Sequence, residues 1–372
     1  MAPISIVHVI NGDIGVGGAE RMLCRIVQAA DRARFEHTVL TILPCLHLES
    51  EMRAAGARFI SLDVQRDTLS LRRVLELVPK LVRVQQVNLY VGWLNYGGVL
   101  ASLLGMAPRR TPIVLNFRST PTPEDLQRPI MRAMRALAPR AARRLANSQG
   151  AVSRLEAAGF GHVDFIANGF SPEEFRRDPV RGAAFRSAHG IPPDVFVFGH
   201  MGRFHPIKNQ AGLLRAATEV LGKHPEAHMA FVGRALPAEL TAHLCAGEVS
   251  QRIHLIEGVD APQDAYSAFD AYVHNSNWEG FPNVIAEAML ESLPIVCSDA
   301  GESRAIVGPD NRVVPPQRDE LLAAAMFEVL RMPTDERIAL GAANRAQIAS
   351  RYSVDRSVSE FERHFSDAAG GR

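Results

Sequence analysis

The sequence predicts an α/β protein built from two doubly wound domains, each a parallel sheet covered by helices. Short β-branched runs alternate with helix-length amphipathic runs from one end of the chain to the other, which is typical of parallel α/β units. The chain has 372 residues. Because single hydrophobic cores stop growing at about 250–300 residues, this length favours two domains.

Charge is distributed unevenly along the chain, which points to the same division. The 41 Lys and Arg residues nearly balance the 40 Asp and Glu residues, for a formal net charge of +1. Residues 1–170 hold 21 basic and 13 acidic residues, whereas residues 171–372 hold 20 and 27. Two halves of opposite sign indicate two domains. The near-neutral total argues against a nucleic-acid-binding protein, which normally carries a large basic excess.

The first half contains six predicted strands separated by helical segments. Each strand is a short run rich in β-branched or aromatic residues, and the six are Ile4–Ile10, His37–Ile42, Arg58–Leu62, Asn88–Val91, Pro112–Asn116 and Asp164–Ala167. Amphipathic periodicity predicts helices over Ala19–Ala30, Leu69–Val84 and Leu126–Leu145.

The second half repeats the pattern after a linker that is predicted to lie within Asn168–Asp194, where Gly, Pro and charged residues are concentrated. Its predicted strands are Val195–His200, His228–Val232, Arg252–Ile256, Ala271–Asn275, Pro294–Ser298 and Arg312–Val314. Two series of βα units, each about the size of one doubly wound domain, predict two Rossmann-like domains. The tail after Ser366 is predicted to fray.

Cysteine spacing and apolar segments bear on the compartment. The four cysteines form no close pair of the kind that binds zinc or does redox chemistry, so a reducing cytoplasm is expected. The N-terminus lacks a basic leader, which predicts a buried first strand rather than a signal peptide. The stretch Tyr96–Pro108 is too short to span a bilayer, so no transmembrane segment is expected.

A glycine-rich loop, Asn11–Gly18, follows the first predicted strand, and a helix is predicted to begin near Ala19. Glycine lets the backbone approach an anion, and a helix N-terminus supplies N–H groups and a partial positive charge. The spacing is not Gly-x-Gly-x-x-Gly, so a nicotinamide cofactor is not expected. The residues of this loop are also consistent with a tight turn that binds nothing.

Two cations lie in the loop that opens the second half. Arg203 and Lys208 flank a turn containing Pro206, between a predicted strand and a helix. Ligands bind at the carboxyl ends of strands in such sheets, and an Arg and a Lys at this spacing can converge on two phosphates. An ordinary solvated loop is an equally good explanation of these residues taken alone.

Two carboxylates lie in the most specific segment, which runs from Asn275 to Met289. Glu279 is placed on the loop after a predicted strand, and Glu287 one turn inside the helix that follows. Carboxylates accept hydrogen bonds from neutral hydroxyl groups, so they suit a sugar or a ribose and are poor ligands for phosphate. A Glu early in a helix is also favourable with the helix dipole, so Glu287 alone indicates little.

The combination of these motifs, in this order, resembles the GT4 family of retaining glycosyltransferases, which has the GT-B fold. Glu279 and Glu287 match the Glu-x7-Glu motif of that family, and Arg203 and Lys208 match its Arg/Lys pair. Gly17–Arg21 matches its N-terminal glycine loop. The resemblance spans nearly the whole chain.

The GT-B fold implied by the resemblance has two Rossmann-like domains that face each other across a cleft. Residues 1–170 would form an acceptor-side domain and residues 171–352 a nucleotide-sugar donor domain. Residues 353–372 would form a C-terminal helix that returns to the first domain and ends in a frayed tail.

The resemblance also implies a role for each motif residue. Arg203 and Lys208 would hold the diphosphate of a UDP- or GDP-linked sugar, which the main chain of Gly17 and Gly18 would face from the other domain. Glu287 would bind the ribose hydroxyls. Glu279 would hold the donor sugar together with backbone groups of Gly280, Phe281, Pro282 and Asn283. The main chain near Ile256–Val259, including Val259, would contact the base.

The implied reaction is sugar transfer with retention of configuration by front-face attack. The leaving diphosphate gains charge as the C–O bond ionises, and Arg203, Lys208 and a helix N-terminus would stabilise that charge. The chain has no Asp-rich metal motif, and the resemblance implies neither a metal nor a cofactor. The acceptor would be a glycan or a lipid-linked sugar in polysaccharide or lipopolysaccharide biosynthesis.

The chain departs from the family pattern on the acceptor side. Family members often have His in the loop that here reads Asn116–Thr120, so either Asn116 or Arg118 is expected to take over that polar contact. Phe170 and Ser171 replace a frequent Asp, and Ala305 stands where Glu is common.

A segment from Gln127 to Leu155 is rich in Arg and contains no acidic residue. Basic amphipathic helices can lie on anionic membranes, so peripheral contact with the cytoplasmic membrane is one expectation. The residues that would make it are Arg128, Arg132, Arg135, Arg140, Arg143 and Arg144. A solvated helix face over a buried apolar stripe is the other explanation.

Three functional classes follow from the sequence. A nucleotide-sugar-dependent transferase agrees with every motif. A GT-B phosphorylase or epimerase would use the same cleft. A degenerate glycan-binding or scaffolding module would keep the fold without turnover, although the intact carboxylate and cation pairs argue against it.

Overall fold

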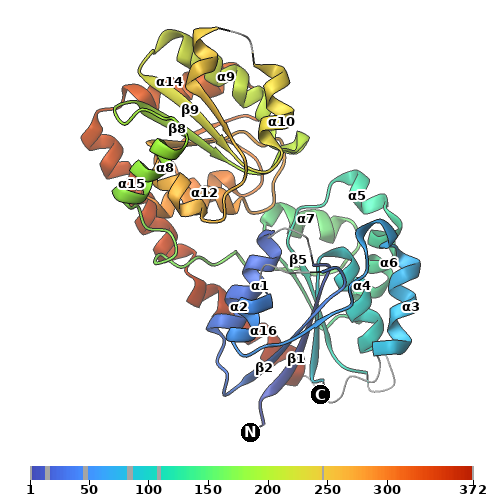
Figure 1. The fold of residues 1–372 in the computed structure, drawn as a ribbon. Coiled ribbons are helices and arrows are strands. Elements are labelled where there is room, and N and C mark those ends of the chain that lie inside the picture. Colours follow the sequence, from blue (N-terminus) through green and yellow to red (C-terminus); the bar gives the residue numbers. More distant parts are fainter. Residues whose placement is uncertain are drawn as a thin grey trace. The chain divides into compact units, whose positions relative to one another are not determined.

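The chain forms two compact units in the computed structural model (Figure 1). The structure describes residues 2–12, 17–44, 49–81, 87–106, 110–244 and 247–370. Unit 1 comprises Met1–Gly169 and Val354–Arg372, and unit 2 comprises Phe170–Ser353. The boundary between the units, from Gly169 to Phe170, lies within Asn168–Asp194, where the linker is expected. Helix α8 (Pro179–Ala188) forms there and belongs to unit 2.

Unit 1 is built on a seven-stranded parallel sheet with the order β3-β2-β1-β4-β5-β6-β7. Its strands are β1 (Ile4–Ile10), β2 (Phe35–Thr41), β3 (Arg58–Ser61), β4 (Leu89–Trp93), β5 (Ile113–Phe117), β6 (Arg143–Ala146) and β7 (Asp164–Phe165). Along β1, Val7 and Val9 enter the core on one face, and Ile6 and Ile10 that on the other. Burial on both faces explains the continuous apolar runs in the sequence.

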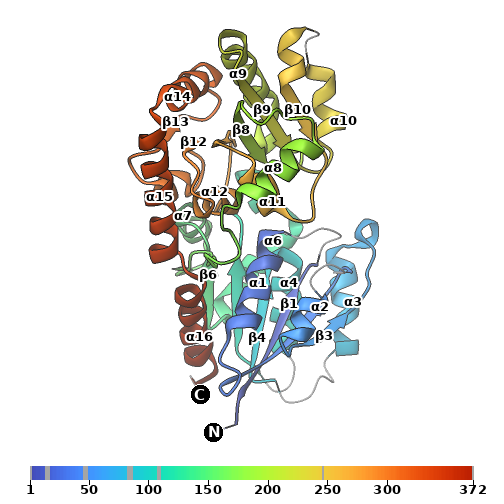
Figure 2. The same ribbon diagram turned by 60° about the vertical axis from the view of Figure 1, so that its left-hand side comes forward.

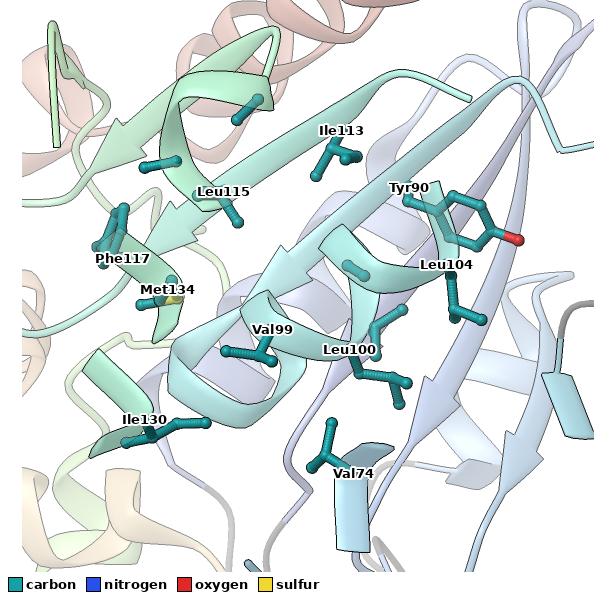
Figure 3. Packing of buried hydrophobic residues seen from close by; sticks show 14 of the residues in the cluster. Val74, Tyr90, Val99, Leu100, Leu104, Ile113, Leu115, Phe117, Ile130 and Met134 are labelled. Atoms are coloured by element: carbon teal, nitrogen blue, oxygen red, sulfur yellow. The ribbon is translucent and has the colours of Figure 1, made fainter. Parts of the chain in front are cut away.

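Helices cover both faces of this sheet. They are α1 (Gly18–Ala29), α2 (Glu49–Ala54), α3 (Leu71–Leu81), α4 (Leu94–Gly105), α5 (Pro123–Gln127), α6 (Pro129–Leu137), α7 (Gln149–Ala157) and α16 (Val354–Gly370). Short 3-10 turns occupy η1 (Arg66–Thr68) and η2 (Ala138–Arg140). Figure 3 shows side chains of α3, α4 and α6 packing on one face of the sheet, over Ile113 and Leu115 of β5.

Close packing of α4 depends on two adjacent glycines. A Cβ on Gly97 would lie 2.4 Å from the carbonyl oxygen of Val9 in β1, and one on Gly98 would lie 2.5 Å from Sδ of Met134 in α6. A side chain at Gly97 would push α4 away from the sheet, whereas one at Gly98 would require the Met134 side chain to move.

The single helix predicted over Leu126–Leu145 is wrong. Arg128 is extended before Pro129, so α5 and α6 are separate, and Pro139 lies in η2. Residues Arg143–Ala146 then form β6, which pairs with β5 on one side and with β7 on the other. Ile130, Met131 and Met134 of α6 are buried in the core. The Arg-rich segment is therefore a helix, a turn, a strand and most of a second helix, α7.

Helix α16 completes unit 1, far in sequence from the rest of it (Figure 2). Val358, Phe361, Phe365 and Ala368 recur at helical spacing and join the same core as α1. Ser357 Oγ donates to the carbonyl of Ala167 at 2.9 Å. The predicted fraying after Ser366 is wrong through Gly370, where the helix ends, and residues 371–372 lie outside the described residues.

Unit 2 is built on a six-stranded parallel sheet with the order β10-β9-β8-β11-β12-β13. Its strands are β8 (Phe196–Met201), β9 (Ala227–Val232), β10 (Ile253–Ile256), β11 (Ala271–His274), β12 (Ile295–Ser298) and β13 (Arg312–Val314). Its helices after α8 are α9 (Gln210–Lys223), α10 (Leu236–Leu240), α11 (Pro262–Ser267), α12 (Asn283–Leu290), α13 (Ser303–Val307), α14 (Asp319–Arg331) and α15 (Thr334–Arg351). The 3-10 turns are η3 (Pro206–Lys208), η4 (Thr241–His243) and η5 (Glu248–Arg252).

The expected doubly wound α/β architecture is confirmed in both units, since each parallel sheet alternates with helices along the chain. Within the described ranges, no helix has both the length and the apolar character needed to cross a bilayer. Cys24 and Cys297 are buried free thiols.

Candidate functional site

The turn that carries Lys208 is held rigidly at the carboxyl end of β8. Nδ1 of His205 accepts a hydrogen bond from the backbone N–H of Ile207 at 3.2 Å, which caps η3. Asn209 then adopts a left-handed conformation, with φ of 48°, from which α9 begins. Asparagine tolerates this conformation better than most residues, so the local sequence determines where Lys208 is presented.

Two motifs that are far apart in sequence meet at this turn. The loop after β11 joins it through the backbone N–H of Asn277, which donates to the carbonyl of Ile207 at 2.7 Å. Lys208 Nζ donates to Glu279 Oε1 at 2.5 Å. Lys208 is 24% and Glu279 is 12% exposed, so this ion pair is mostly shielded from water.

Three donors converge on one oxygen of Glu279. Besides Lys208, Ser276 Oγ donates to Oε1 at 2.6 Å and His274 Nε2 donates to it at 3.1 Å. No described residue bonds the other oxygen, Oε2. A carboxylate held this way offers Oε2 as an acceptor for a neutral O–H donor such as a sugar hydroxyl.

Charges around Glu279 keep this carboxylate ionised. Burial opposes ionisation, but the Lys208 ammonium and the hydrogen bond from His274 outweigh it and lower the pKa of Glu279. Burial lowers the pKa of His274, so this imidazole is neutral near pH 7. Glu279 is thus suited to binding and electrostatic work rather than to proton donation.

Buried rings lie behind this cluster. His274 stacks on Tyr272 and on His200, and burial with the neighbouring His274 lowers the pKa of His200 to about 3. Nδ1 of His200 is 3.0 Å from the carbonyl of Val273 and donates to it. The rings hold the strand end that carries His274, because they leave it little room to rotate.

A second loop braces the backbone of Glu279 and Gly280. The N–H of Glu302 donates to the carbonyl of Gly280 at 3.0 Å. Gly301 has φ of 59°, and a Cβ there would lie 2.4 Å from that carbonyl oxygen and 2.6 Å from the carbonyl oxygen of Glu279. Only glycine fits at this position.

Arg203 lies beside this network without joining it. Its side chain is exposed and makes no hydrogen bond or ion pair with the described residues, while its carbonyl accepts from Gln210 Nε2 at 3.0 Å. The structure therefore engages Lys208 with a carboxylate and leaves the Arg203 guanidinium open to an external anion.

Glu287 lies in α12, on the side that faces α11. Tyr266 Oη donates to Glu287 Oε2 at 2.9 Å, and burial together with Glu287 raises the pKa of Tyr266 well above its usual value. Gly280, Phe281 and Pro282 precede this helix, and Asn283 is its first residue.

The segment expected to contact a base follows β10. The N–H of Gly233 donates to the carbonyl of Ile256 at 3.0 Å, and the N–H of Ala235 donates to Glu257 Oε1 at 3.1 Å. Val259 is half-buried three residues beyond the end of β10. These two hydrogen bonds hold the segment that carries Val259 against the loop after β9.

The remaining predicted residues lie in unit 1. Gly17 caps α1, whose first residue is Gly18, whereas Asp13–Val16 of the same loop lie outside the described residues. Arg118 and Asn116 are buried together at the end of β5, and Arg118 Nη1 donates to Asn116 Oδ1 at 3.3 Å.

Sequence reasoning missed His274, His205 and Tyr266 as parts of the site. The signal for His274 was its position at the carboxyl end of a strand, two residues before Ser276. Alternate residues of an extended chain point to the same side, so both reach Glu279. Within the described residues, no group of three or more His, Cys, Asp or Glu side chains is arranged to hold a metal ion.

Comparisons with known proteins agree with this arrangement. Residues 195–332 match the family model described as glycosyl transferases group 1, and residues 17–169 match that of the glycosyl transferase 4-like domain. The putative glycosyltransferase EpsF of Bacillus subtilis is 24% identical over 310 residues, 79% of each chain. D-inositol 3-phosphate glycosyltransferase 2 of Catenulispora acidiphila is 31% identical over 160 residues, which are 40% of this chain and 37% of that protein.

Among solved structures, Anabaena Alr3699/HepE in complex with UDP and glucose is similar in fold. It superposes with a TM-score of 0.83 at 22% identity, over 97% of this chain and 99% of that one.

Proposed function

Because this chain belongs to the group 1 glycosyltransferases of the GT4 family and has the GT-B fold, we propose that it transfers a sugar from a nucleoside diphosphate sugar to an acceptor hydroxyl with retention of configuration. The observation that carries this proposal is the ion pair of Lys208 with Glu279, which brings a cation suited to phosphate and a carboxylate suited to hydroxyl groups into one site. The UDP and glucose bound to a protein of the same fold agree with it.

Each charged group has one task in the proposed reaction. Arg203, which is exposed and without a partner in the described part of the chain, binds the donor diphosphate, and Lys208 adds a second positive charge beside it. Glu279 Oε2 accepts from a hydroxyl of the donor sugar. Glu287, held by Tyr266, accepts from the ribose hydroxyls.

The chemical step exchanges one C–O bond for another. The bond from C1 of the sugar to the diphosphate breaks, and the acceptor oxygen bonds C1 from the same face. The acceptor proton passes to an oxygen of the leaving phosphate. Charge that develops on the diphosphate is stabilised by Arg203 and Lys208, so the proposal requires neither a metal nor a cofactor.

For the acceptor we propose a glycan or a lipid-linked sugar of polysaccharide or lipopolysaccharide biosynthesis. We propose that the transfer takes place in the cytoplasm, at the face of the membrane. The arginines proposed to make a membrane contact differ in their surroundings. Arg144 donates to backbone carbonyls, Arg143 pairs with Asp367, and Arg128 pairs with Asp125. Arg132, Arg135 and Arg140 are also exposed, and of these Arg135 donates to the carbonyl of Ala158 at 3.5 Å.

Nucleotide release from a panel of UDP- and GDP-sugars tests the function. We expect turnover by the wild type with at least one donor and a loss of about 10²–10³-fold in the Arg203→Ala/Lys208→Ala variant. Glu279→Gln should also lose activity, while Glu219→Gln, an exposed carboxylate on α9, is the matched control. No binding or turnover of any nucleotide sugar would refute the transferase in favour of a degenerate module.

Two further measurements test the finer points. The anomeric coupling constant of the product, read by NMR, should match that of the donor, and an inverted product would refute retention. Activity should survive treatment with EDTA, and its loss with recovery on adding Mg²⁺ would refute the metal-independent step.

A further inference from the structure

Arg118 is a buried cation without a counter-ion in the described part of unit 1. It is 8% exposed, and its guanidinium lies 5.5 Å from the ring centroid of the fully buried Phe361. The hydrogen-bond acceptors around it are neutral: Asn116 Oδ1, the carbonyl of Ile166 and Asn168 Oδ1. Among the described residues, the positive charge is thus held in place but not cancelled.

The amide side chains beside Arg118 belong to a row of asparagines along the carboxyl edge of the unit 1 sheet. An asparagine lies at or just beyond the carboxyl end of five strands of this sheet, namely Asn11, Asn95, Asn116, Asn147 and Asn168. Asparagine supplies oxygen acceptors without negative charge. Burying an unpaired charge is costly, so a guanidinium kept here among neutral amides indicates a ligand that supplies the missing charge.

Hydrogen-bonding capacity remains unused in this cluster. Arg118 has five N–H groups, of which three make the hydrogen bonds described above. The buried Nε of Arg118 and the buried Nδ2 of Asn116 have no partner among the described residues. Guanidinium N–H pairs match the two oxygens of a carboxylate or a phosphate.

A cavity of about 190 Å³ lies at the same edge of the sheet, lined in part by Arg118, Ser119 and Asn95. Asp125 also lines it, but this carboxylate accepts from the N–H of Thr122 and pairs with Arg128. Leu94, another lining residue, has φ of 59°, a strained conformation of the kind that clusters at ligand sites.

We propose that Arg118 binds an oxyanion of the acceptor substrate, a phosphate or a carboxylate, at the carboxyl edge of the unit 1 sheet. The assignment to the acceptor rests on the proposed function, whereas the anion site itself does not. It narrows the acceptor from any hydroxyl compound to one that carries an anionic group. Burial lowers the pKa of Arg118 only to about 9, so the cation persists at neutral pH.

Calorimetric titration of the full chain with glucose 1-phosphate, glucuronate and glucose tests the site and separates the two sources of the oxyanion. Saturating UDP or GDP, whichever binds more tightly, is present to fill the diphosphate site. We expect at least one anionic sugar to bind the wild type more tightly than glucose. Arg118→Gln should weaken that binding by about 10- to 100-fold and leave glucose unchanged.

The controls separate binding from folding. Arg72→Gln, which removes a 90% exposed cation from the same unit, should bind like the wild type. If Arg118→Gln does not fold, Arg118→Lys is the alternative variant, because it keeps the charge but lacks the planar pair of N–H donors. It should bind the anion more weakly and have an unchanged thermal midpoint. Equal affinity of the wild type for all three sugars, or of Arg118→Gln for its anionic ligand, would overturn the proposal.

Turnover of nucleotide sugars distinguishes this proposal from the function on which it rests. Transfer of the donor sugar to water does not involve the anion, so this turnover by the wild type and by Arg72→Gln tests the proposed function separately from the oxyanion site. Turnover without anion preference would refute the oxyanion site alone. Anion binding without any turnover would refute the glycosyltransferase function and leave the site standing.

Discussion

Removing Lys208 should expose how strongly the site depends on its ion pair. The Glu279 side chain is only 12% exposed, and in Lys208→Met its carboxylate loses the donor at 2.5 Å. Ser276 and His274 still donate to it. Breaking a buried pair by removing one partner costs about 3–5 kcal/mol, and the two remaining donors place the expected loss of unfolding free energy at about 3 kcal/mol.

The matching change, Glu279→Gln, should cost less. A glutamine oxygen still accepts from Ser276, and Lys208 is the more exposed partner, so about 1–2 kcal/mol is expected. The double variant should lose about 2 kcal/mol less unfolding free energy than the sum of the losses in the two single variants. That difference measures the pair itself.

Urea unfolding followed by fluorescence of Trp278 is a suitable assay, because Trp278 adjoins Glu279 and the other tryptophan, Trp93, lies in unit 1. All four members of the cycle would carry Trp93→Phe, so its effect cancels. A coupling below about 0.5 kcal/mol would place the pair with solvent-screened surface salt bridges and refute the reasoning. Because the pKa of Glu279 is lowered from its usual 4.5, its contribution to stability is present above pH 4.5 and is lost as the pH falls below that value.

Three further outcomes follow from the structure. Gly301→Ala should lower activity at least tenfold and destabilise unit 2 by about 1–3 kcal/mol, because it combines a φ of 59° with contacts of 2.4 and 2.6 Å; Gly222→Ala, where no atom lies within 4 Å of the new Cβ, is the control, and equal effects of the two would contradict this. Burial lowers the pKa of His37 to about 4 from 6.5, so its neutral form stabilises the fold above pH 6.5 and that contribution falls by about 2 kcal/mol at pH 5; thermal unfolding of His37→Gln should lack this part of the pH dependence, and an unchanged pH profile would show the shift to be absent. Arg132→Gln/Arg135→Gln/Arg140→Gln should weaken binding to vesicles of anionic lipid, with a salt-sensitive loss of about 1 kcal/mol per residue, and unchanged vesicle binding would refute the proposed membrane contact.

Strand β6 illustrates where pattern reasoning from the sequence failed. Its residues Arg143–Ala146 are two arginines followed by Leu and Ala, none of which is β-branched. Their local sequence therefore does not distinguish them from a helical segment. Pairing with β5 and β7 decides their conformation. Strand formation depends on neighbours more than on intrinsic preference, and one of these neighbours, β5, pairs Val114 with Arg143, far apart in the sequence.

The candidate site shows the same division between local and tertiary information. Motif order and spacing alone singled out Arg203, Lys208, Glu279 and Glu287 as charged groups at strand ends. Their spacing did not reveal that Lys208 bonds Glu279, because 71 residues separate them. It also did not reveal that Arg203 stays exposed.

By itself, the sequence determined the class of fold, the strands of both sheets apart from β6, and the family, because periodicity and loop chemistry are local properties of the chain. Only the tertiary structure decided which charges are paired and which are open. Pairing depends on the register of parallel strands and on which loops meet at their carboxyl ends. Lys208 therefore pairs with a carboxylate, whereas Arg118 lies among neutral amides. These surroundings determine which charge is neutralised within the protein and which is available to a ligand.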